Sequence, residues 1–591
     1  MEVRTLNDVF FTVVDRGKER LMLTREAANR WLPVSSQDFY RKVTALARAF
    51  REWGLVKGER IAILSENRPE WAITDFAALY LGAVTVPIYT TLTADQTAYI
   101  LADSGAKVVV VSSRQQLEKV ASARCKTGVQ QVVVMDWLDT SEAVPIQALM
   151  SKSSSERDPE LDRIAREILP NDPASIIYTS GTTGTSKGVQ LTHGNLASNI
   201  MHSMAGFDIV PGDVSVSFLP LSHVTARHVD FGLLYHGVTL AYCPFIEDLP
   251  QALLEIRPTI FVGVPRVYEK MYAQVGQKVK GATKKRIYRW ALSVGRSHCT
   301  KILAGRKPVS PAWKLADRLV FSKVRERIGG RVRIFVSGGA PLGKELAQWY
   351  ADMGIRIHEG YGLTETSPVI AINNPGFHRL GSVGRVLPNV EVRIAEDGEI
   401  LVRGPSVFRT YWNRPEETRD AFVNGWFKTG DIGNLDADGF LSVTDRKKDL
   451  LKTSGGKFIA PQPVENTLKL NALIGTAVVL GDRRKFPSVL ISPHFPLLET
   501  WARENDIAFS SKAHLVAHPK VRTLYEGIVE EVNQSLARYE KLKKILLVPD
   551  EFTTIDGSLT PTLKLRRKVI EERYREQIED LYRQSEMSNV A

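Results

Sequence analysis

The sequence is poor in cysteine. Its 591 residues include only three, Cys125, Cys243 and Cys299, which lie far apart and form no C-x-x-C pair. This spacing argues against a disulfide framework and against a zinc site. It favours a protein of a reducing compartment.

Long apolar runs are also missing. No uninterrupted apolar stretch reaches about 18 residues, the length that a membrane-spanning helix requires. The first residues, MEVRTLNDVFFTVVDRGKER, carry acids from the second position and no apolar core, unlike a signal peptide. We therefore expect a cytoplasmic protein, either free or resting peripherally on the inner face of a membrane.

Positive charge is in excess, with a formal net charge of +12. A basic balance favours anionic partners such as nucleotides, acidic substrates or membrane surfaces. With 43% hydrophobic and 24% charged residues, the composition is that of an ordinary globular protein. The length allows roughly four units of about 150 residues.

The charge is concentrated between Arg266 and Arg333, where 19 Lys and Arg residues accompany three acids. Within this segment, Ile287, Trp290, Ala291 and Val294 recur at helical spacing. The segment is either a solvated helical face or a peripheral contact with anionic lipid. Nucleic acid is disfavoured because no nucleic-acid-binding motif accompanies the charge.

The hydrophobic pattern of the first half alternates between helix and strand. FYRKVTALARAFREWGLVKGERIAIL predicts an amphipathic helix, a turn and a strand, while AKVVVVSS and VQQVVVMDW are typical of buried parallel strands. From Val383 to Val443 the pattern becomes β, with hairpins predicted at Asp397-Gly398 and Asp438-Gly439. The remainder mixes short strands with charged helices and predicts a small α+β unit.

One loop points to phosphate chemistry. In IIYTSGTTGTSKGVQLTH, eight consecutive Ser, Thr and Gly residues precede Lys187. Glycines let the backbone present N–H donors to a phosphate, the hydroxyls add further donors, and the lysine adds a charge. The loop is not a Walker A motif, because two residues separate Gly184 from Lys187.

This loop and five later stretches resemble the adenylate-forming superfamily, which includes acyl-CoA synthetases, luciferases and peptide-synthetase adenylation domains. The loop is similar to that superfamily's phosphate loop. The other matches follow in the family's order: SGGAPL (337–342), EGYGLTETS (359–367), GWFKTGD (425–431), DRKKDLLKTSGGKFIAPQPVE (445–465) and LTPTLKLRRKVI (559–570). Together they span about two-thirds of the chain.

The resemblance implies an α/β fold in two domains. The large N-terminal domain, residues 1–445, would combine αβ subdomains with a β-rich subdomain and hold the ATP and acyl sites. The small α+β C-terminal domain, residues 446–591, would be mobile about a hinge near Lys448 and would carry Lys564.

The resemblance also implies the nucleotide contacts. Phosphate contacts are expected at Thr179, Ser180, Gly181, Thr182, Thr183, Gly184 and Lys187. Adenine and ribose contacts are expected at Gly339, Ala340, Gly360, Tyr361, Asp431 and Arg446. Tyr361 either stacks on the adenine or is an ordinary core tyrosine. Asp431 and Arg446 together could grip a ribose diol, the first accepting and the second donating hydrogen bonds.

Three further positions are expected to take part in the chemistry. Glu365, next to Thr364, would place a carboxylate beside nucleotide phosphates, and the repulsion implies an intervening Mg²⁺. The resemblance alone singles out Lys564, which would stabilise charge as the carboxylate attacks the α-phosphate. His223 either lines or gates the acyl pocket or packs as an ordinary core histidine.

The second half-reaction is expected to use a different face of the C-terminal domain. After rotation at Lys448, Ser454 and Gly455 would lie near the thiol cofactor, and Lys457 would meet terminal phosphates. Only 27 residues follow Lys564, so we expect no fused carrier domain and a free thiol, coenzyme A, as the acyl acceptor.

We therefore expect a long-chain fatty acid–CoA ligase that uses ATP, Mg²⁺ and coenzyme A. LPLSHV, VGVPRVYEKM and the basic segment 266–333 resemble long-chain enzymes more than acetate or aryl-acid ones. Three alternatives stay open: an acyl-AMP ligase that loads a separate carrier, a synthetase for a medium-chain or aryl acid, and a luciferase-like oxygenase.

Overall fold

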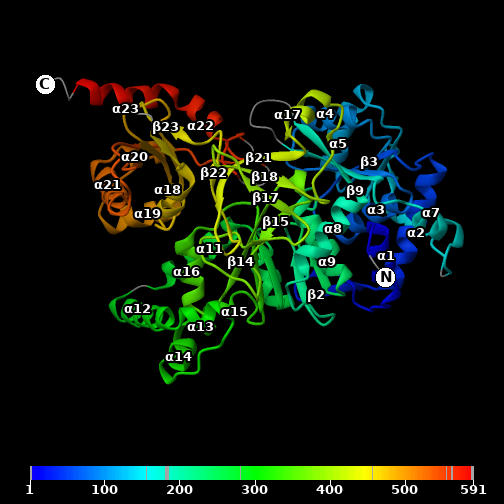
Figure 1. The fold of residues 1–591 in the computed structure, drawn as a ribbon, viewed down its shortest axis with the longest axis horizontal. Coiled ribbons are helices and arrows are strands. Elements are labelled where there is room, and N and C mark those ends of the chain that lie inside the picture. Colours follow the sequence, from blue (N-terminus) through cyan, green and yellow to red (C-terminus); the bar gives the residue numbers. More distant parts are fainter. Residues whose placement is uncertain are drawn as a thin grey trace.

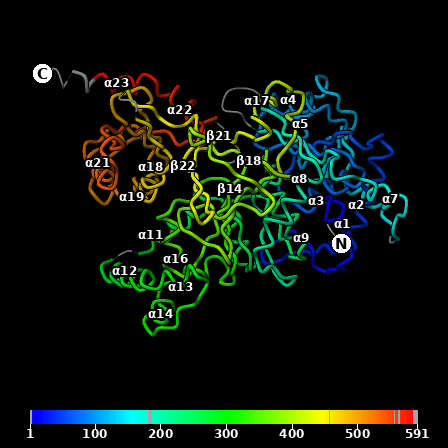
Figure 2. The backbone as a smooth tube through the Cα atoms, in the orientation of Figure 1, coloured from blue at the N-terminus to red at the C-terminus, as the bar shows by residue number. Residues whose placement is uncertain are grey.

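The computed structural model describes residues 3–154, 156–179, 186–279, 281–454, 457–553, 556–560 and 564–587. Figure 1 shows the first two hundred residues on the right and the residues up to about 450 in the middle. A separate unit of the last residues lies at the upper left. The backbone trace in Figure 2 shows the same arrangement. We call residues 3–446 the N-terminal body and residues 451–587 the C-terminal unit.

The first sheet of the N-terminal body is mainly parallel. Among the described residues its strands are, in order, β19 (Thr410–Tyr411), β9 (Lys187–Thr192), β8 (Pro173–Thr179), β4 (Val84–Ile88), β3 (Arg60–Leu64), β5 (Val108–Val111), β6 (Gln131–Val134) and β7 (Val144–Pro145). Its centre is β-branched and buried on both faces, as parallel strands require.

The second sheet is built in the same way. Among the described residues its strands are, in order, β16 (Arg385–Val386), β15 (Val369–Ile372), β14 (Ile357–Gly362), β13 (Ile334–Ser337), β12 (Ile260–Gly263), β10 (Val214–Ser217), β11 (Thr239–Tyr242), β1 (Met22–Ala27) and β2 (Arg30–Val34). The strands β10 to β14 run parallel, so their carboxyl ends lie at one edge of the sheet.

A layer of helices lies between the two sheets. It consists of α1 (Leu6–Asp15), α2 (Ser36–Glu52), α3 (Pro69–Tyr80), α8 (His193–Met204) and α9 (Val224–Tyr235). One buried cluster joins these helices to inward-facing strand residues such as Ile61, Ile260 and Ile334. Their sequence neighbours Ala62, Phe261 and Phe335 belong to clusters on the outer faces. The two-residue period of a strand therefore decides which residues face the inner helices.

These elements confirm the helix and strand predictions for the first half. The predicted helix–turn–strand segment forms α2 and β3, and the two valine-rich runs form the parallel pair β5 and β6. The buried parallel centre follows from the same apolar runs that predicted it.

The β-rich part also forms as predicted. Both expected hairpins are antiparallel: β17 (Glu391–Ile394) pairs with β18 (Glu399–Arg403), and β21 (Trp426–Leu435) pairs with β22 (Leu441–Arg446). The predicted domain boundary falls inside β22, one residue before that strand ends. The position of the hinge stays a prediction.

The C-terminal unit has its own core. Strands β25 (Ile474–Leu480), β26 (Ser488–Pro493) and β27 (Ile545–Leu547) form its sheet. The helices α18 (Pro461–Leu468), α19 (Phe495–Glu504) and α21 (Pro519–Asn533) cover one face of this sheet. The helices α22 (Arg567–Arg573) and α23 (Arg575–Met587) lie on the other. The mixed α+β character agrees with the prediction.

The basic segment folds into helices that project from the N-terminal body, at the lower left of Figure 1. They are α11 (Pro265–Lys278), α12 (Ala282–Ser297), α13 (Cys299–Leu303), α14 (Pro311–Ala316) and α15 (Ser322–Glu326). In α12 the predicted apolar stripe is only partly buried: Ala291 is inside, whereas Ile287 and Trp290 are exposed. Within the residues that the structure describes, no helix combines the length and apolar character needed to cross a membrane.

Candidate active site

The candidate site lies where the strands of the second sheet end. Gly338 and Gly339 follow β13, and Gly360, Tyr361 and Gly362 end β14. Gly339 has φ +82°, a left-handed conformation that favours glycine. A Cβ on Gly362 would lie 1.7 Å from the Pro368 carbonyl oxygen, so only glycine fits this turn. The turns bring predicted adenine-side residues together, with Ala340 exposed beside them.

The predicted phosphate loop joins the hairpin strands β8 and β9. Thr179 ends β8 and pairs directly with Lys187, the first residue of β9. Ser180, Gly181, Thr182, Thr183 and Gly184 lie outside the described residues. The Lys187 ammonium lies over the ring of Tyr411, 5.4 Å from its centre. This cation–π contact directs Lys187 toward the turn that follows β14.

Tyr411 links Lys187 to the predicted metal-binding glutamate. Its hydroxyl donates a 2.9 Å hydrogen bond to Oε1 of Glu365, and burial raises the pKa of the phenol, which therefore stays a donor. Glu365 is in the short 3₁₀ helix Thr364–Thr366. The Phe408 amide donates a hydrogen bond to the backbone carbonyl of Glu365 and holds this turn in place. The structure thus brings Lys187 and Glu365 together through a residue that the sequence motifs did not indicate.

The predicted ribose residues lie side by side. Asp431 and Arg446 face each other across β21 and β22, and Nε of Arg446 is 3.0 Å from Oδ1 of Asp431. The Tyr361 hydroxyl donates a 2.6 Å hydrogen bond to Oδ2 of the same carboxylate. Burial and the charge of Asp431 raise the pKa of Tyr361 far above its usual value. Asp431 is therefore held on both oxygens by permanent donors.

Lys564 reaches this group from the C-terminal unit. The residue is exposed, yet the surrounding protein and the charge of Arg446 lower the pKa of its ammonium to about 8. The carboxylates of Asp431 and Glu365 act in the opposite direction. A hydrogen bond from the Lys564 amide to Oγ1 of Thr560, at 3.0 Å, holds the backbone. The structure therefore brings Lys564 to the predicted nucleotide residues of the N-terminal body.

His223 is the N-cap of helix α9, which begins at Val224, and the charge of Lys564 acts on its ring. Its Nδ1 accepts a 3.1 Å hydrogen bond from the Thr225 amide and so caps the helix. Burial and the charge of Lys564 lower the pKa of its imidazole to about 3. The ring is therefore neutral at physiological pH, with Nε2 left as the protonated nitrogen.

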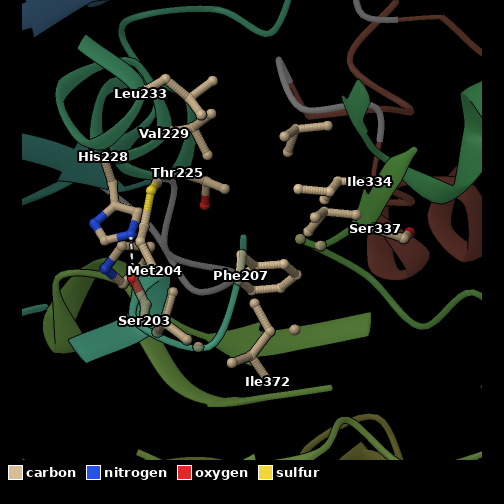
Figure 3. Close-up of a pocket in the computed structure, with 18 of the residues that line it drawn as sticks. Ser203, Met204, Phe207, Thr225, His228, Val229, Leu233, Ile334, Ser337 and Ile372 are labelled. Atoms are coloured by element: carbon tan, nitrogen blue, oxygen red, sulfur yellow. Dashed lines mark hydrogen bonds between the residues drawn. The ribbon is translucent and has the colours of Figure 1, made fainter. Parts of the chain in front are cut away.

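An apolar cavity opens from the same turns into the layer between helix and sheet (Figure 3). Its empty space is about 750 Å³, a figure that includes open solvent at its mouth. Gly338, Gly339, Gly360, Tyr361 and Gly362 line one end of it. Helix α9 contributes Thr225, His228, Val229 and Leu233, and the facing strands contribute isoleucines and valines. His223 itself precedes the lining residue Thr225 by two positions.

The residues predicted for the second half-reaction lie elsewhere. Among the described residues, Ser454 and Lys457 hydrogen-bond only to Arg484 and Thr453 of the C-terminal unit. Gly455 lies outside the described residues. Lys448 follows β22 between the two parts, and burial lowers the pKa of its ammonium. The charges of Arg446, Asp431 and Glu365 act on Lys564, whereas the described hydrogen bonds of Ser454 and Lys457 stay within the C-terminal unit.

The donor set around Glu365 limits the kind of metal that would fit. The described residues contain no cluster of three or more His, Cys, Asp or Glu side chains suited to hold a metal ion. Mg²⁺ in nucleotide enzymes commonly takes one or two carboxylates, with substrate phosphates and water as its other ligands. A single carboxylate such as Glu365 fits a cation carried by the nucleotide.

Two features were missed in the sequence. Tyr411 lies in an unremarkable segment, FRTYWNRP, that carried no signal for the site. The cavity-lining residues Thr225, Val229 and Leu233 recur every fourth position of α9. That spacing was available as a signal for one helix face, although it did not show that the face borders a cavity.

Comparison with known proteins gives two family matches. The AMP-binding enzyme family matches residues 10–412, and the AMP-binding enzyme C-terminal domain matches residues 448–586. The long-chain-fatty-acid–CoA ligase FadD15 of Mycobacterium bovis is 37% identical over 563 residues, which cover 93% of this chain and 92% of that protein. The peroxisomal long chain acyl-CoA synthetase 7 of Arabidopsis thaliana is 32% identical, covering 100% and 88%.

Solved structures show the same fold at lower identity. The adenylation domain of a carboxylate reductase from Mycobacterium chelonae has a TM-score of 0.76 at 24% identity, covering 98% of this chain and 91% of that one. The anthranilate CoA ligase AuaEII has a TM-score of 0.75 at 20% identity, covering 98% and 99%.

Proposed function

We propose that this chain, which belongs to the family of AMP-binding enzymes, is a long-chain fatty acid–CoA ligase. The enzyme activates a fatty acid with ATP to give acyl-AMP and pyrophosphate, and then transfers the acyl group to coenzyme A with release of AMP. The two family matches and the 37% identity to a long-chain-fatty-acid–CoA ligase support this activity.

The observation that carries the substrate assignment is the position of the apolar cavity. Its mouth is lined by Gly339 and Tyr361, which also belong to the predicted adenine side. A fatty acid whose tail lies in the cavity would therefore place its carboxylate at the nucleotide. The apolar lining favours an alkyl chain over a small polar acid.

In the first half-reaction, a carboxylate oxygen forms a bond to the α-phosphorus while the bond to the pyrophosphate oxygen breaks. Lys564 stabilises the negative charge that builds up on the transferred group. Asp431 and Arg446 bind the ribose hydroxyls, and Lys187 with the loop 180–184 holds the phosphates that leave. The neutral His223 donates a hydrogen bond from Nε2 and so orients the carboxylate or closes the acyl pocket.

Mg²⁺ bound to the nucleotide would neutralise phosphate charge in this step. Glu365 is the residue that would hold it, and Tyr411 orients the glutamate by donating to Oε1. No described residue hydrogen-bonds to Oε2 of Glu365, so the carboxylate can take the metal without losing its bond to Tyr411.

The second half-reaction requires the C-terminal unit to turn about Lys448. The thiol of coenzyme A attacks the acyl carbonyl, and the bond to the AMP oxygen breaks. Rotation would withdraw Lys564 and bring Ser454, Gly455 and Lys457 to the site. The arrangement with Lys564 at Arg446 and Asp431 is the one suited to adenylation.

Pyrophosphate and AMP release with palmitate, measured with and without coenzyme A, tests the assignment. The ligase needs coenzyme A for continued turnover and yields acyl-CoA. Sustained AMP release without coenzyme A would sink this reading. Acyl transfer to an isolated carrier protein in preference to coenzyme A would favour a carrier-loading ligase, and turnover of benzoate alone would favour an aryl-acid synthetase.

The basic segment 266–333 supports a peripheral contact with anionic lipid on the inner face of a membrane. In α12, Lys284, Lys285, Arg286 and Arg289 are exposed and form no ion pair with any described acid. The partly exposed Ile287 and Trp290 lie among them. Cosedimentation with anionic vesicles at low salt is expected. Failure to pellet, or equal pelleting after these four residues are changed to glutamine, contradicts the contact.

A further inference from the structure

The acyl cavity is bounded by regularly spaced side chains of three elements. Thr225, Val229 and Leu233 lie one beyond another along α9, as Figure 3 shows. The opposite wall takes alternate residues of two strands, Ile260 and Val262 from β12 and Ile334 and Val336 from β13. A four-residue period on the helix and a two-residue period on the strands each give a continuous apolar wall.

The two walls run in opposite directions. Helix α9 connects β10 to its parallel neighbour β11, so it starts at the carboxyl edge of the sheet and ends at the amino edge. Thr225 is therefore near the mouth and Leu233 is far from it. On the strands the order is reversed, with Gly338 at the mouth and Ile334 at the far end.

Both walls give the same depth. Eight residues of helix separate Thr225 from Leu233, which corresponds to about 12 Å at the α-helical rise. Four residues of strand separate Gly338 from Ile334, which corresponds to about 13 Å. An extended alkyl chain advances roughly 1.25 Å per carbon, given tetrahedral single bonds. A straight acyl chain of roughly ten carbons therefore reaches the far end.

Beside Phe207 and Ile209 of the loop that precedes β10, the far end is lined by Leu233, Ile260 and Ile334. Their exposed fractions are 2%, 2% and 5%, and all three belong to the buried cluster between the two sheets. Because this cluster is packed in regular elements, a longer chain has to bend or displace side chains there. We call these three residues the floor of the cavity.

We propose that the floor, and Leu233 above all, determines the chain-length preference of the enzyme. This inference rests on the proposed fatty acid–CoA ligase activity and adds a residue that selects among its substrates. Removing the outer carbons of Leu233 deepens the cavity along the axis of the acyl chain. The kcat/KM for long acyl chains then rises, because they no longer have to bend or displace side chains, while the kcat/KM for chains that end short of the floor stays the same.

Leu234 supplies a matched control. It is as deeply buried as Leu233 and is the next residue of the same helix, but it faces a separate small cavity beside Trp71 and Tyr242. Leu233→Ala and Leu234→Ala therefore remove the same atoms from the same helix. Only the first changes the acyl cavity.

The experiment measures kcat/KM for palmitate and for decanoate by pyrophosphate release in the full-length protein. We expect Leu233→Ala to raise the palmitate-to-decanoate ratio about tenfold over the unmodified protein, and Leu234→Ala to leave it unchanged. Leu233→Val, a milder truncation, is expected to shift the ratio in the same direction by a smaller factor. Melting temperatures of all variants check that the fold persists.

The same ratio in Leu233→Ala and Leu234→Ala would overturn the inference, as would a shift toward decanoate. A shift in Leu233→Val alone still supports it if the alanine variant fails to fold. Absence of pyrophosphate release with either acid in the unmodified protein would instead overturn the proposed function itself. The two failures are therefore distinguishable.

Discussion

The mouth and the floor of the acyl cavity are built in opposite ways. At the mouth, charged and hydroxyl side chains converge from several turns and from both parts of the chain, with Lys564 arriving from the C-terminal unit. At the floor, three apolar side chains come from a helix and two strands of the N-terminal body. Chemistry at the mouth therefore depends on how the two parts are placed, and selectivity at the floor depends on packing within one part.

The largest effect is expected from a substitution at the mouth that leaves the packing of the floor unchanged. Lys564→Ala should slow adenylation roughly 10²–10³-fold, because a preorganised charge at the transferred phosphate is lost. Formation of acyl-CoA from supplied acyl-AMP should be spared. Pyrophosphate release and acyl-CoA formation measure the two half-reactions separately.

The exposed Lys568, four residues further along, provides the control, and Lys568→Ala should keep both rates. Equal loss of the two half-reactions in Lys564→Ala would show that Lys564 is not specific to adenylation. The ratio of kcat/KM for palmitate to kcat/KM for decanoate should not change in either variant.

Lys187 is expected to matter for the nucleotide alone. Lys187→Ala removes a charged contact to phosphate, worth about 1.5–3 kcal/mol, so the KM for ATP should rise roughly 10- to 100-fold. Steady-state kinetics with ATP as the varied substrate give this value. An unchanged KM for ATP together with a raised KM for the fatty acid would show that Lys187 acts on the fatty acid and not on the nucleotide.

Raising the pH should reduce the activity that depends on the Lys564 charge and leave the chain-length preference unchanged. Lys564 is charged below its pKa of about 8 and neutral above it, so kcat/KM for ATP should fall about tenfold per pH unit above that value. With ATP bound, the phosphates favour the ammonium form, and the fall in kcat should lie at higher pH.

Lys564→Arg serves to identify the titrating group, because arginine keeps its charge over this range. Its profile should lose the alkaline fall. His223, with a pKa of about 3, should add no further step near neutrality. A profile of Lys564→Arg that matches the unmodified protein assigns the fall to another group.

The smallest effect tests the link between Lys187 and Glu365. Tyr411→Phe keeps the ring below the Lys187 ammonium but removes the donor to Oε1 of Glu365. Because Glu365 is only half-buried, water can replace the lost donor, and the change costs about 1 kcal/mol, as for an ordinary hydrogen bond. We therefore expect kcat/KM to fall about fivefold. Titration of Mg²⁺ should then give a higher half-saturating metal concentration, whereas an unchanged value would mean that Tyr411 does not orient Glu365.

Much of this molecule could be predicted without coordinates. Apolar periodicity gave the strands β5 and β6, the helix α2 and both hairpins, because burial and turn chemistry are local properties. The ordered motifs indicated the family, and with it Lys564, Glu365, Asp431 and Arg446. No periodicity argument would have separated Lys564 from its basic neighbours Arg566 and Lys568.

The features that could not be predicted from the sequence are those formed by contacts between residues far apart in the chain. Tyr411 touches Glu365 only because β19 joins the edge of the first sheet next to β9. Which arrangement of the C-terminal unit is adopted also follows from contacts across the hinge. Such contacts leave no mark in the local pattern of either partner.

What the sequence by itself determined about α9 is the order of its side chains, in which Arg227, His228 and Asp230 interrupt the apolar residues. It placed two leucines side by side, Leu233 and Leu234, with nothing local to tell them apart. One turn of helix holds 3.6 residues, so neighbours point about 100° apart. Only the tertiary structure decided that Leu233 lines the far end of the acyl cavity while Leu234 packs against α3 and β11, because the sheets on either side of α9 define where the empty space lies.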